Sequence, residues 1–360
     1  MTDLFSPLSF ACGAHMRNRF MMAPLTNLQS YADGRLSEAE FEWLTMRARG
    51  GFGAVMTCAA HVQARGQGFP GQLGVFDEIH ETGLARLAGA IREQGSLALC
   101  QLHHAGARAP AELIATTPVA PSDDPESGAR ALATDEVAAL VEDFIRAAER
   151  CERAGFDGVE LHGAHGYILC DFLAAERNHR QDRYGGNARN RARVLREIID
   201  GIRARCRPGF CLGVRLSPER FGVRTPDMVE LAGQLMAEGH VDFLDLSLWD
   251  VFKAPEDEAL GGRSLLGLFT GLDRHGVRLG AAGKISAPAD ARRAMARGLD
   301  FVILGRAAIV HHDFPARLAA DPAFEPTPPP YTEAHLRAEG VSPPFLDYLE
   351  SRGLLPVDTG

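Results

Sequence analysis

The stretch GVELHGAHGYILCDFLAAERNHRQDRYGG, residues 158–186, contains the side chains best suited to chemistry. It begins like a buried strand and ends in polar, glycine-rich chain, and His162, His165 and Tyr167 lie where the strand runs out. Two imidazoles three positions apart can bind a metal ion or donate hydrogen bonds to one oxygen, and a nearby phenol can donate a proton. From these residues alone, a metal site, a hydrogen-bonding clamp and a purely structural role all stay open.

Short apolar segments that alternate with amphipathic helices must position these side chains. One helix is expected from Thr134, as its N-cap, to Gly155, with apolar residues at helical spacing between them. Eight βα units predict an α/β fold, namely a single (β/α)₈ TIM barrel, with a doubly wound open sheet as the alternative. The eight strand segments are 19–24, 53–58, 97–102, 158–162, 211–216, 241–248, 277–283 and 301–305.

The domain organisation follows from where linkers are absent and where proline is frequent. We find no linker between residues 1 and 320 and predict one barrel domain there. The segment DPAFEPTPPPYTEAHLRAEG is proline-rich, so residues 321–360 are expected to form an extended C-terminal extension. One or two short helices of this extension would pack on the barrel or on a neighbouring subunit.

Composition narrows the class of partner. The 360 residues are 46% hydrophobic with a formal net charge of -9, which argues against nucleic acid and against a basic membrane-binding face. The seven cysteines are scattered without a CxxC pair, as in proteins of reducing compartments. The N-terminus lacks a basic region before an apolar core, and no apolar run reaches membrane-spanning length. We expect a cytoplasmic protein with a small-molecule substrate, and leave a homo-oligomer open.

In a TIM barrel, the active site lies at the C-terminal ends of the strands. Polar and small residues gather at those ends: residues 24–26, Ala59, Gln101, His103, His104, His162, Arg215, residues 247–249, Gly283, Gly305 and Arg306. The last two strands end in glycines followed by an arginine, a pattern typical of a phosphate site built from backbone amides. Since successive strand residues face opposite ways, at most one of His103 and His104 points inward, and we assign both a structural role.

Several motifs in this order and spacing resemble the old yellow enzyme family of flavin-dependent ene-reductases, also called NADH:flavin oxidoreductases. They are NRFMMAPLTN (18–27), CQLHHAG (100–106), GFDGVELHGAHGY (155–167), NHRQDRYGG (178–186), GVRLS (213–217) and FVILGRAAI (301–309). Together they cover residues 1 to about 320. The resemblance implies a barrel with non-covalently bound FMN at its mouth and NAD(P)H as reductant.

The resemblance also implies which residues bind FMN: Ala23, Pro24, Leu25, Thr26, Ala59, Gln101, Arg215, Gly283, Gly305 and Arg306. Thr26 would reach the flavin O4, and Ala59 and Gln101 the pyrimidine edge. Arg215 would lie beside N1 and O2, because a fixed cation stabilises the negative charge of reduced flavin. The amides of the two glycines, with Arg306, would hold the phosphate.

By the same resemblance, His162 and His165 bind an oxygen of the substrate, a carbonyl or nitro compound, and thereby polarise its conjugated C=C bond. Tyr167 then donates a proton to the α-carbon after hydride reaches the β-carbon. NAD(P)H reduces FMN first in the same pocket, which gives ping-pong turnover. Trp249 either lines the substrate pocket or packs in the core.

Two departures and two rival interpretations bear on this assignment. Position 28 is leucine where several relatives carry a substrate-facing tyrosine, and no cysteine follows Cys211, which excludes the iron–sulfur centre of larger relatives. One alternative is a metal-dependent barrel hydrolase with Glu160, His162 and His165 as ligands. The other is a flavin-binding protein without turnover.

Overall fold

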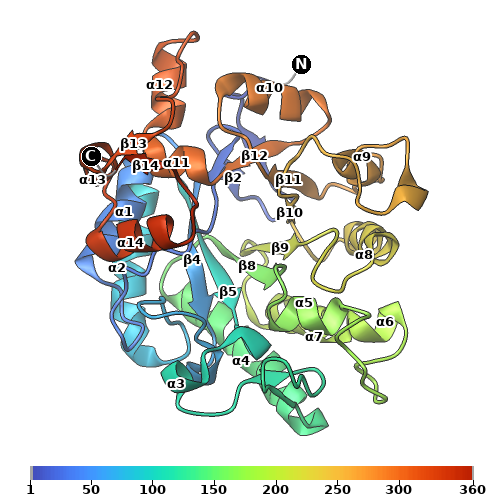
Figure 1. Cartoon of the computed structure of the whole chain (residues 1–360). Coiled ribbons are helices and arrows are strands. Elements are labelled where there is room, and N and C mark those ends of the chain that lie inside the picture. The colour runs from blue at the N-terminus through green and yellow to red at the C-terminus, as the bar shows by residue number, and fades with distance from the viewer. Residues whose placement is uncertain (1–2, 359–360) are drawn as a thin grey trace.

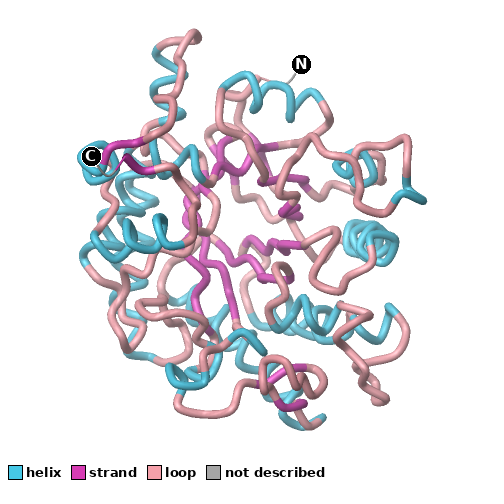
Figure 2. Tube along the Cα trace, in the orientation of Figure 1, coloured by secondary structure: helices cyan, strands magenta, loops and turns pink. Residues whose placement is uncertain are grey.

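Eight parallel strands form a closed barrel in the computed structural model, which describes residues 3–358 (Figures 1 and 2). Around the barrel the strands are β3 (Phe20–Met22), β4 (Ala54–His61), β5 (Leu97–His103), β8 (Gly158–Gly163), β9 (Cys211–Leu216), β10 (Phe243–Ser247), β11 (Arg278–Ala282) and β12 (Phe301–Leu304). Each overlaps a segment that the sequence predicts as a strand, although β4 runs to His61, past the predicted end at residue 58, and β5 and β8 each end one residue later than predicted. The predicted TIM barrel is therefore confirmed, and the open sheet is wrong.

Helices follow the strands and cover the outside of the barrel. The longer ones are α1 (Glu38–Arg49), α2 (Glu81–Glu93), α4 (Thr134–Arg153), α7 (Arg193–Arg205), α8 (Thr225–Glu238) and α10 (Pro288–Ala296). Thr134 is not the N-cap of α4: that position is Ala133, and the Thr134 hydroxyl donates to Asp182 instead. Between residues 3 and 358, none of the helices combines the length and apolar character needed to cross a bilayer.

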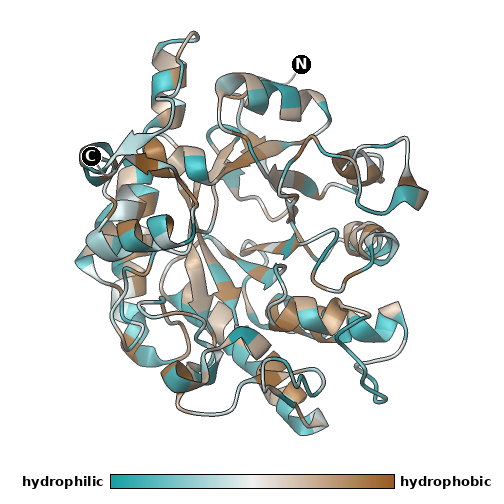
Figure 3. Cartoon of the chain, viewed as in Figure 1, coloured by the Kyte–Doolittle hydropathy of each residue, from teal (hydrophilic) through white to brown (hydrophobic). Residues whose placement is uncertain are grey.

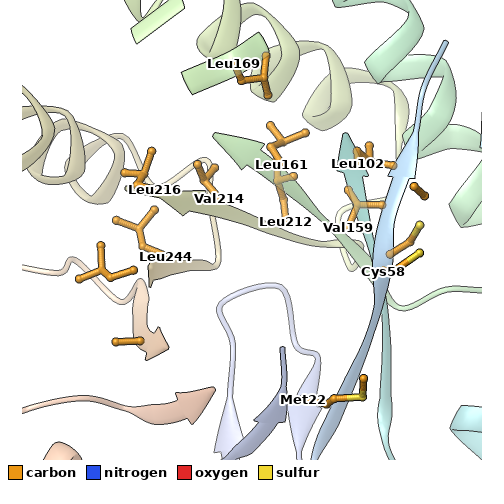
Figure 4. Packing of buried hydrophobic residues seen from close by; sticks show 14 of the residues in the cluster. Met22, Cys58, Leu102, Val159, Leu161, Leu169, Leu212, Val214, Leu216 and Leu244 are labelled. Atoms are coloured by element: carbon orange, nitrogen blue, oxygen red, sulfur yellow. The ribbon is translucent and has the colours of Figure 1, made fainter. Parts of the chain in front are cut away.

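Side chains alternate along each strand between the barrel interior and the helical layer. In β8, Val159 and Leu161 join the apolar cluster beneath the helices, together with Leu212 and Val214 of β9 (Figure 4). Glu160 and His162 consequently point into the barrel. Hydrophilic residues concentrate on the outer helices and loops (Figure 3).

Aromatic side chains fill the N-terminal end of the barrel. The short hairpin of β1 (Leu8–Ser9) and β2 (His15–Met16) covers this end, and the ring of Phe10 lies 5.6 Å from that of Phe243 and 6.3 Å from that of Phe301. Gly213 and Gly280 make room for these rings, since a side chain at either position would overlap one of them. This end is closed by packing, so the site must lie at the opposite end.

The C-terminal extension packs on the barrel of its own chain. It contains α13 (Glu333–Ala338), α14 (Pro343–Ser351) and a strand pair, β13 (Tyr331–Thr332) with β14 (Val357–Asp358). The ring centre of Phe345 in α14 lies 5.4 Å from that of Trp43 in α1, and the two ring planes are nearly perpendicular, at 84°. The division of the chain into a barrel domain (1–320) and an extension (321–360) stays a prediction. Residues 1–2 of the first range and 359–360 of the second lie outside the described residues.

Candidate active site

The chain bends sharply after β8. His165 has a φ of 64° and Gly166 a φ of 68°, and Tyr167 is the residue that precedes α5 (Ile168–Leu173). Left-handed backbone is uncommon for residues other than glycine and concentrates at functional sites. Leu28 and Trp249, in the loops after β3 and β10, share this conformation. Strained backbone is therefore concentrated at the C-terminal end of the barrel.

The bend brings the three predicted catalytic residues together. Nε2 of His162 lies 2.9 Å from Nδ1 of His165, and Nε2 of His165 lies 2.7 Å from the hydroxyl of Ser247. The Tyr167 ring centre is 5.0 Å from that of His162. The two imidazoles bond to each other here rather than to a common point, and among the described residues Nδ1 of His162 has no hydrogen-bond partner although it is buried.

Burial fixes the protonation states of these groups. The pKa of His162 lies well below its usual range, mainly because the ring is buried. The neighbouring groups His165, His103 and Arg215 lower it further, since each would repel a positive charge on the ring. The pKa of His165 falls to about 3, mainly because it is buried. Burial raises the pKa of Tyr167 above its usual value. At neutral pH the site therefore contains two neutral imidazoles and a protonated phenol.

His103 belongs to this cluster, whereas the sequence analysis assigns it only a structural role. Its ring centre is 4.4 Å from that of Tyr167, and its Nδ1 lies 3.1 Å from the side-chain nitrogen of Gln72. His104 instead faces away from the cluster and contacts Gln63. The alternation rule contained the signal, because His103 shares a strand face with Gln101, two residues earlier.

A layer of buried polar side chains lies next to the histidines on β5, β8, β9 and β10. Gln101 donates to Glu160 at 2.7 Å, and Nε of Arg215 lies 3.0 Å from a carboxylate oxygen of Asp245. Burial raises the pKa of Asp245 to about 6, although the positive charge of Arg215 opposes this shift. Burial also raises the pKa of Glu160 well above its usual range, and the negative charge of Asp245 adds to that effect. The layer thus contains one ion pair beside a carboxyl group whose burial favours the protonated form.

Sequence reasoning missed Asp245, which occupies an inward position in the otherwise apolar segment VDFLDLSL. An acid within such a strand is the signal that was available, because buried carboxylates are seldom found without a partner. Arg215 is buried with it. The arginine therefore has a structural partner in addition to whatever it binds at the mouth.

The loop after β3 meets the end of β12 at the predicted phosphate region. The amide of Ala23 donates to Leu304, and a side-chain carbon built on Gly305 would contact only Leu25 and Ala23. Gly305 precedes α11 (Arg306–Val310), and Arg306 is exposed. Small residues thus leave space at this side of the mouth.

The remaining predicted residues lie at the same end of the barrel. Ala59 pairs with Gln101 next to an irregularity in β4, and Pro24 and Thr26 are half-buried. Gly283 follows β11 with a φ of 149°. Trp249 does not pack in the core, because 68% of it is exposed and the guanidinium of Arg220 lies 5.3 Å from its ring centre.

These residues fit a flavin mononucleotide. Ala59 and Gly305 leave room, Arg215 supplies a buried cation, and Nδ1 of His162 and Nε2 of His103 are buried polar atoms without partners among the described residues. The alternative metal ligands do not assemble: within the described chain, the groups of His, Cys, Asp and Glu close enough to hold a metal ion lie elsewhere. Gln101 binds Glu160, and the two histidines bind each other.

Comparison with known proteins agrees with this geometry. Residues 3–323 match the NADH:flavin oxidoreductase / NADH oxidase family. The chain is 36% identical over 317 residues to the probable NADH-dependent flavin oxidoreductase YqiG of Bacillus subtilis, covering 85% of each protein. It is 32% identical to an NADH:fumarate oxidoreductase of Klebsiella pneumoniae, with 89% of this chain matched to only 36% of that longer protein.

The solved structures point the same way. An old yellow enzyme homologue from Zymomonas mobilis superimposes with a TM-score of 0.78 and 27% identity, covering 90% of this chain and 94% of that one. The family match spans the whole barrel, including every residue of the site described above. The chain therefore belongs to the old yellow enzyme family and is an NAD(P)H-dependent flavin oxidoreductase with FMN as its cofactor.

Proposed function

We propose that this enzyme uses NAD(P)H to reduce C=C bonds conjugated to a carbonyl or nitro group, in ping-pong turnover. The observation that carries the proposal is the cluster of His162, His165 and Tyr167 at the barrel mouth. It combines two neutral imidazoles with a phenol that keeps its proton. When bound, FMN would supply the redox chemistry, namely the transfer of hydride from NAD(P)H to the β-carbon of the alkene.

The imidazoles bind and polarise the substrate oxygen. Nδ1 of His162 is the buried atom without a partner, and we assign it as the first donor. His165 becomes a second donor to the same oxygen if its Nε2 carries the proton and leaves the Ser247 hydroxyl, and if its bond to His162 is broken, because two neutral imidazoles have only two N–H groups. Donors aimed at an oxygen that gains negative charge stabilise the transition state more than the ground state.

Tyr167 delivers the proton. Its hydroxyl makes no hydrogen bond with a described residue, and burial keeps it protonated well past neutral pH. Arg108 stabilises the loop that holds this residue, since it donates to the backbone oxygen of His165 at 2.5 Å and lies 5.5 Å from the Tyr167 ring centre. Arg215 supplies positive charge for the reduced cofactor.

The test separates the two halves of turnover in the Tyr167→Phe variant. We expect reduction of bound flavin by NADPH to stay within about twofold of wild type, while alkene reduction slows by about 10²-fold or more, the usual contribution of a positioned acid. Tyr184→Phe is a matched control, because its hydroxyl contacts Arg183 and Glu197 outside the site. An equal fall in both half-reactions would show that Tyr167 is not the proton donor.

Steady-state oxidation of NADPH with 2-cyclohexen-1-one, with the saturated ketone as product, separates this function from flavin binding without turnover. Absence of product from any enone or nitroalkene, in protein that contains FMN, would contradict the proposal.

A further inference from the structure

A second cavity opens beside the proposed catalytic residues. Its volume is about 560 Å³, and it is lined by Ala107, residues 120–126, Asp171, Glu176, Arg177, His179, Phe221 and Gly222. Carboxylates dominate the lining, which includes Asp123, Asp124, Glu126, Asp171 and Glu176. Arg177 and His179 are the basic residues in the same lining. The cavity therefore has an excess of negative charge.

This cavity adjoins the active site. Phe221 lines it, and the centre of the Phe221 ring is 6.0 Å from that of His165. The guanidinium carbon of Arg108 lies 5.9 Å from the Phe221 ring centre and 5.5 Å from that of Tyr167. Asp171 follows Tyr167 by one helical turn, and its amide donates to the Tyr167 carbonyl at 2.8 Å. Phe221 and Arg108 thus lie between the cavity and the catalytic residues.

Asp171 is the distinctive group in this lining. Only 2% of its side chain is exposed, and its Oδ1 has no hydrogen-bond partner among the described residues. The nearest cation is Arg177, whose Nε is 3.7 Å away, beyond hydrogen-bond distance. Burial, opposed by Arg177 and Arg108, raises the pKa of Asp171 to about 7. The ion pair with Arg177 offsets part of the cost of burying this carboxylate, but Oδ1 still lacks a hydrogen-bond donor, which a ligand can supply.

The arrangement of the other carboxylates indicates the kind of ligand. Asp124 is occupied by Ser127, by the amide of Glu126 and by an ion pair with Arg177 at 3.7 Å, whereas the side chains of Glu126 and Glu176 make no hydrogen bond or ion pair with described residues. Within the described chain, no three of these acids come close enough together to hold a metal ion. Dispersed negative charge around one buried acceptor suits an organic ammonium group, which is large and carries several N–H donors.

We propose that this cavity is an accessory subsite that binds the primary ammonium group of a substrate whose activated alkene lies at His162 and Tyr167. The inference rests on the proposed function for the position of the alkene. Asp171 accepts from the ammonium group, and Phe221 forms the wall along which the rest of the substrate passes. The enzyme then favours amine-bearing substrates over neutral ones of the same shape.

The experiment compares tyramine with 4-propylphenol, which have the same shape and differ in the terminal group. Both dissociation constants are measured at pH 8.5 from changes in the visible flavin spectrum of the holoenzyme. The ratio of the two constants within one protein cancels general effects of a substitution. We expect the preference for tyramine to fall about fivefold or more in Asp171→Asn, the range for one partly buried charge pair.

Two further variants sharpen the comparison. Glu93→Gln removes the same charge from an exposed position at the end of α2 and should keep the wild-type ratio. Glu176→Gln, at the rim of the cavity, should lower the ratio less than Asp171→Asn. A second pair with a longer chain, 4-(4-aminobutyl)phenol and 4-pentylphenol, tests whether the ammonium group must lie farther from the phenol ring to contact Asp171. An unchanged ratio in Asp171→Asn for both pairs overturns the proposal.

A measurement without the flavin signal keeps this inference separate from the proposed function. If 4-propylphenol leaves the flavin spectrum unchanged, the histidine clamp fails, and binding of n-butylammonium chloride is then followed by calorimetry. Binding to wild type and Glu93→Gln that is lost in Asp171→Asn supports the subsite. Absence of binding to wild type overturns it.

Discussion

The ion pair between Arg215 and Asp245 allows a structural role to be separated from a cofactor role. Asp245 is fully buried, and its pKa is about 6 rather than 3.8 even with the arginine 3.0 Å away. At about 1.4 kcal/mol per pKa unit, the buried carboxylate already costs about 3 kcal/mol at neutral pH. Arg215→Met leaves that charge without its cation, and we expect a further loss of about 3–5 kcal/mol.

The pH dependence of this loss follows from the same pKa. In the folded state Asp245 binds its proton more tightly than in the unfolded chain, so its contribution to stability is present below about pH 4 and is lost as pH rises through about 6. Without Arg215 the folded-state pKa rises further. The destabilisation by Arg215→Met should therefore be large at pH 8 and small at pH 5.

The assay uses the double variant Arg215→Met/Asp245→Asn as its matched control. Removing both charges should restore the free energy of unfolding of the flavin-free protein, measured by urea titration, to within about 1–2 kcal/mol of wild type. FMN affinity, measured by fluorescence quenching, should stay weakened at least tenfold in both variants, because the cation that we propose to lie opposite the flavin is absent in each. A double variant that binds FMN like wild type would refute the cofactor role and leave Arg215 as the partner of Asp245.

Three further predictions concern single side chains. His162→Ala should weaken binding of phenolic ligands about tenfold or more while the protein stays yellow, and unchanged affinity would remove the clamp. Trp249→Ala should raise KM for bulky aromatic enones and change the free energy of unfolding by no more than about 0.5 kcal/mol, because the side chain is exposed; a large loss of stability would contradict its surface position. Asp171→Asn should match wild type near pH 4 and exceed it by up to about 4 kcal/mol at pH 8, because the folded-state pKa of about 7 makes wild type lose stability between these values. Urea titrations at both pH values check this, and a gap that does not grow with pH would contradict it.

The strands were predictable from sequence because each is an apolar segment set off by turn residues. Segments such as 211–216 and 301–305 contain the observed strands with shifts of one residue or less at their ends. Buried parallel strands are continuously apolar in sequence because helices cover the sheet on the outside and the barrel interior is packed. The N-cap of α4 was wrong by one residue because Thr134 found a side-chain partner in Asp182, a contact that sequence does not reveal.

Side-chain pairings at the site were less accessible to sequence reasoning. Sequence placed His162 and His165 at the end of one strand, but the bond between their rings depends on the left-handed backbone at His165. Asp245 and Asp171 escaped notice because the burial of a carboxylate and the partners that surround it are properties of the folded chain. Motif spacing identifies which residues meet, whereas their protonation depends on what surrounds them.

The most direct measurement follows the visible spectrum of the purified protein without oxygen, first with one equivalent of NADPH and then with 2-cyclohexen-1-one. We predict that the yellow colour bleaches with NADPH and returns with the enone, with one saturated ketone formed per flavin. A protein that bleaches and stays bleached with enones and nitroalkenes would contradict the proposed reduction of activated C=C bonds, and would leave a flavin oxidoreductase with another electron acceptor.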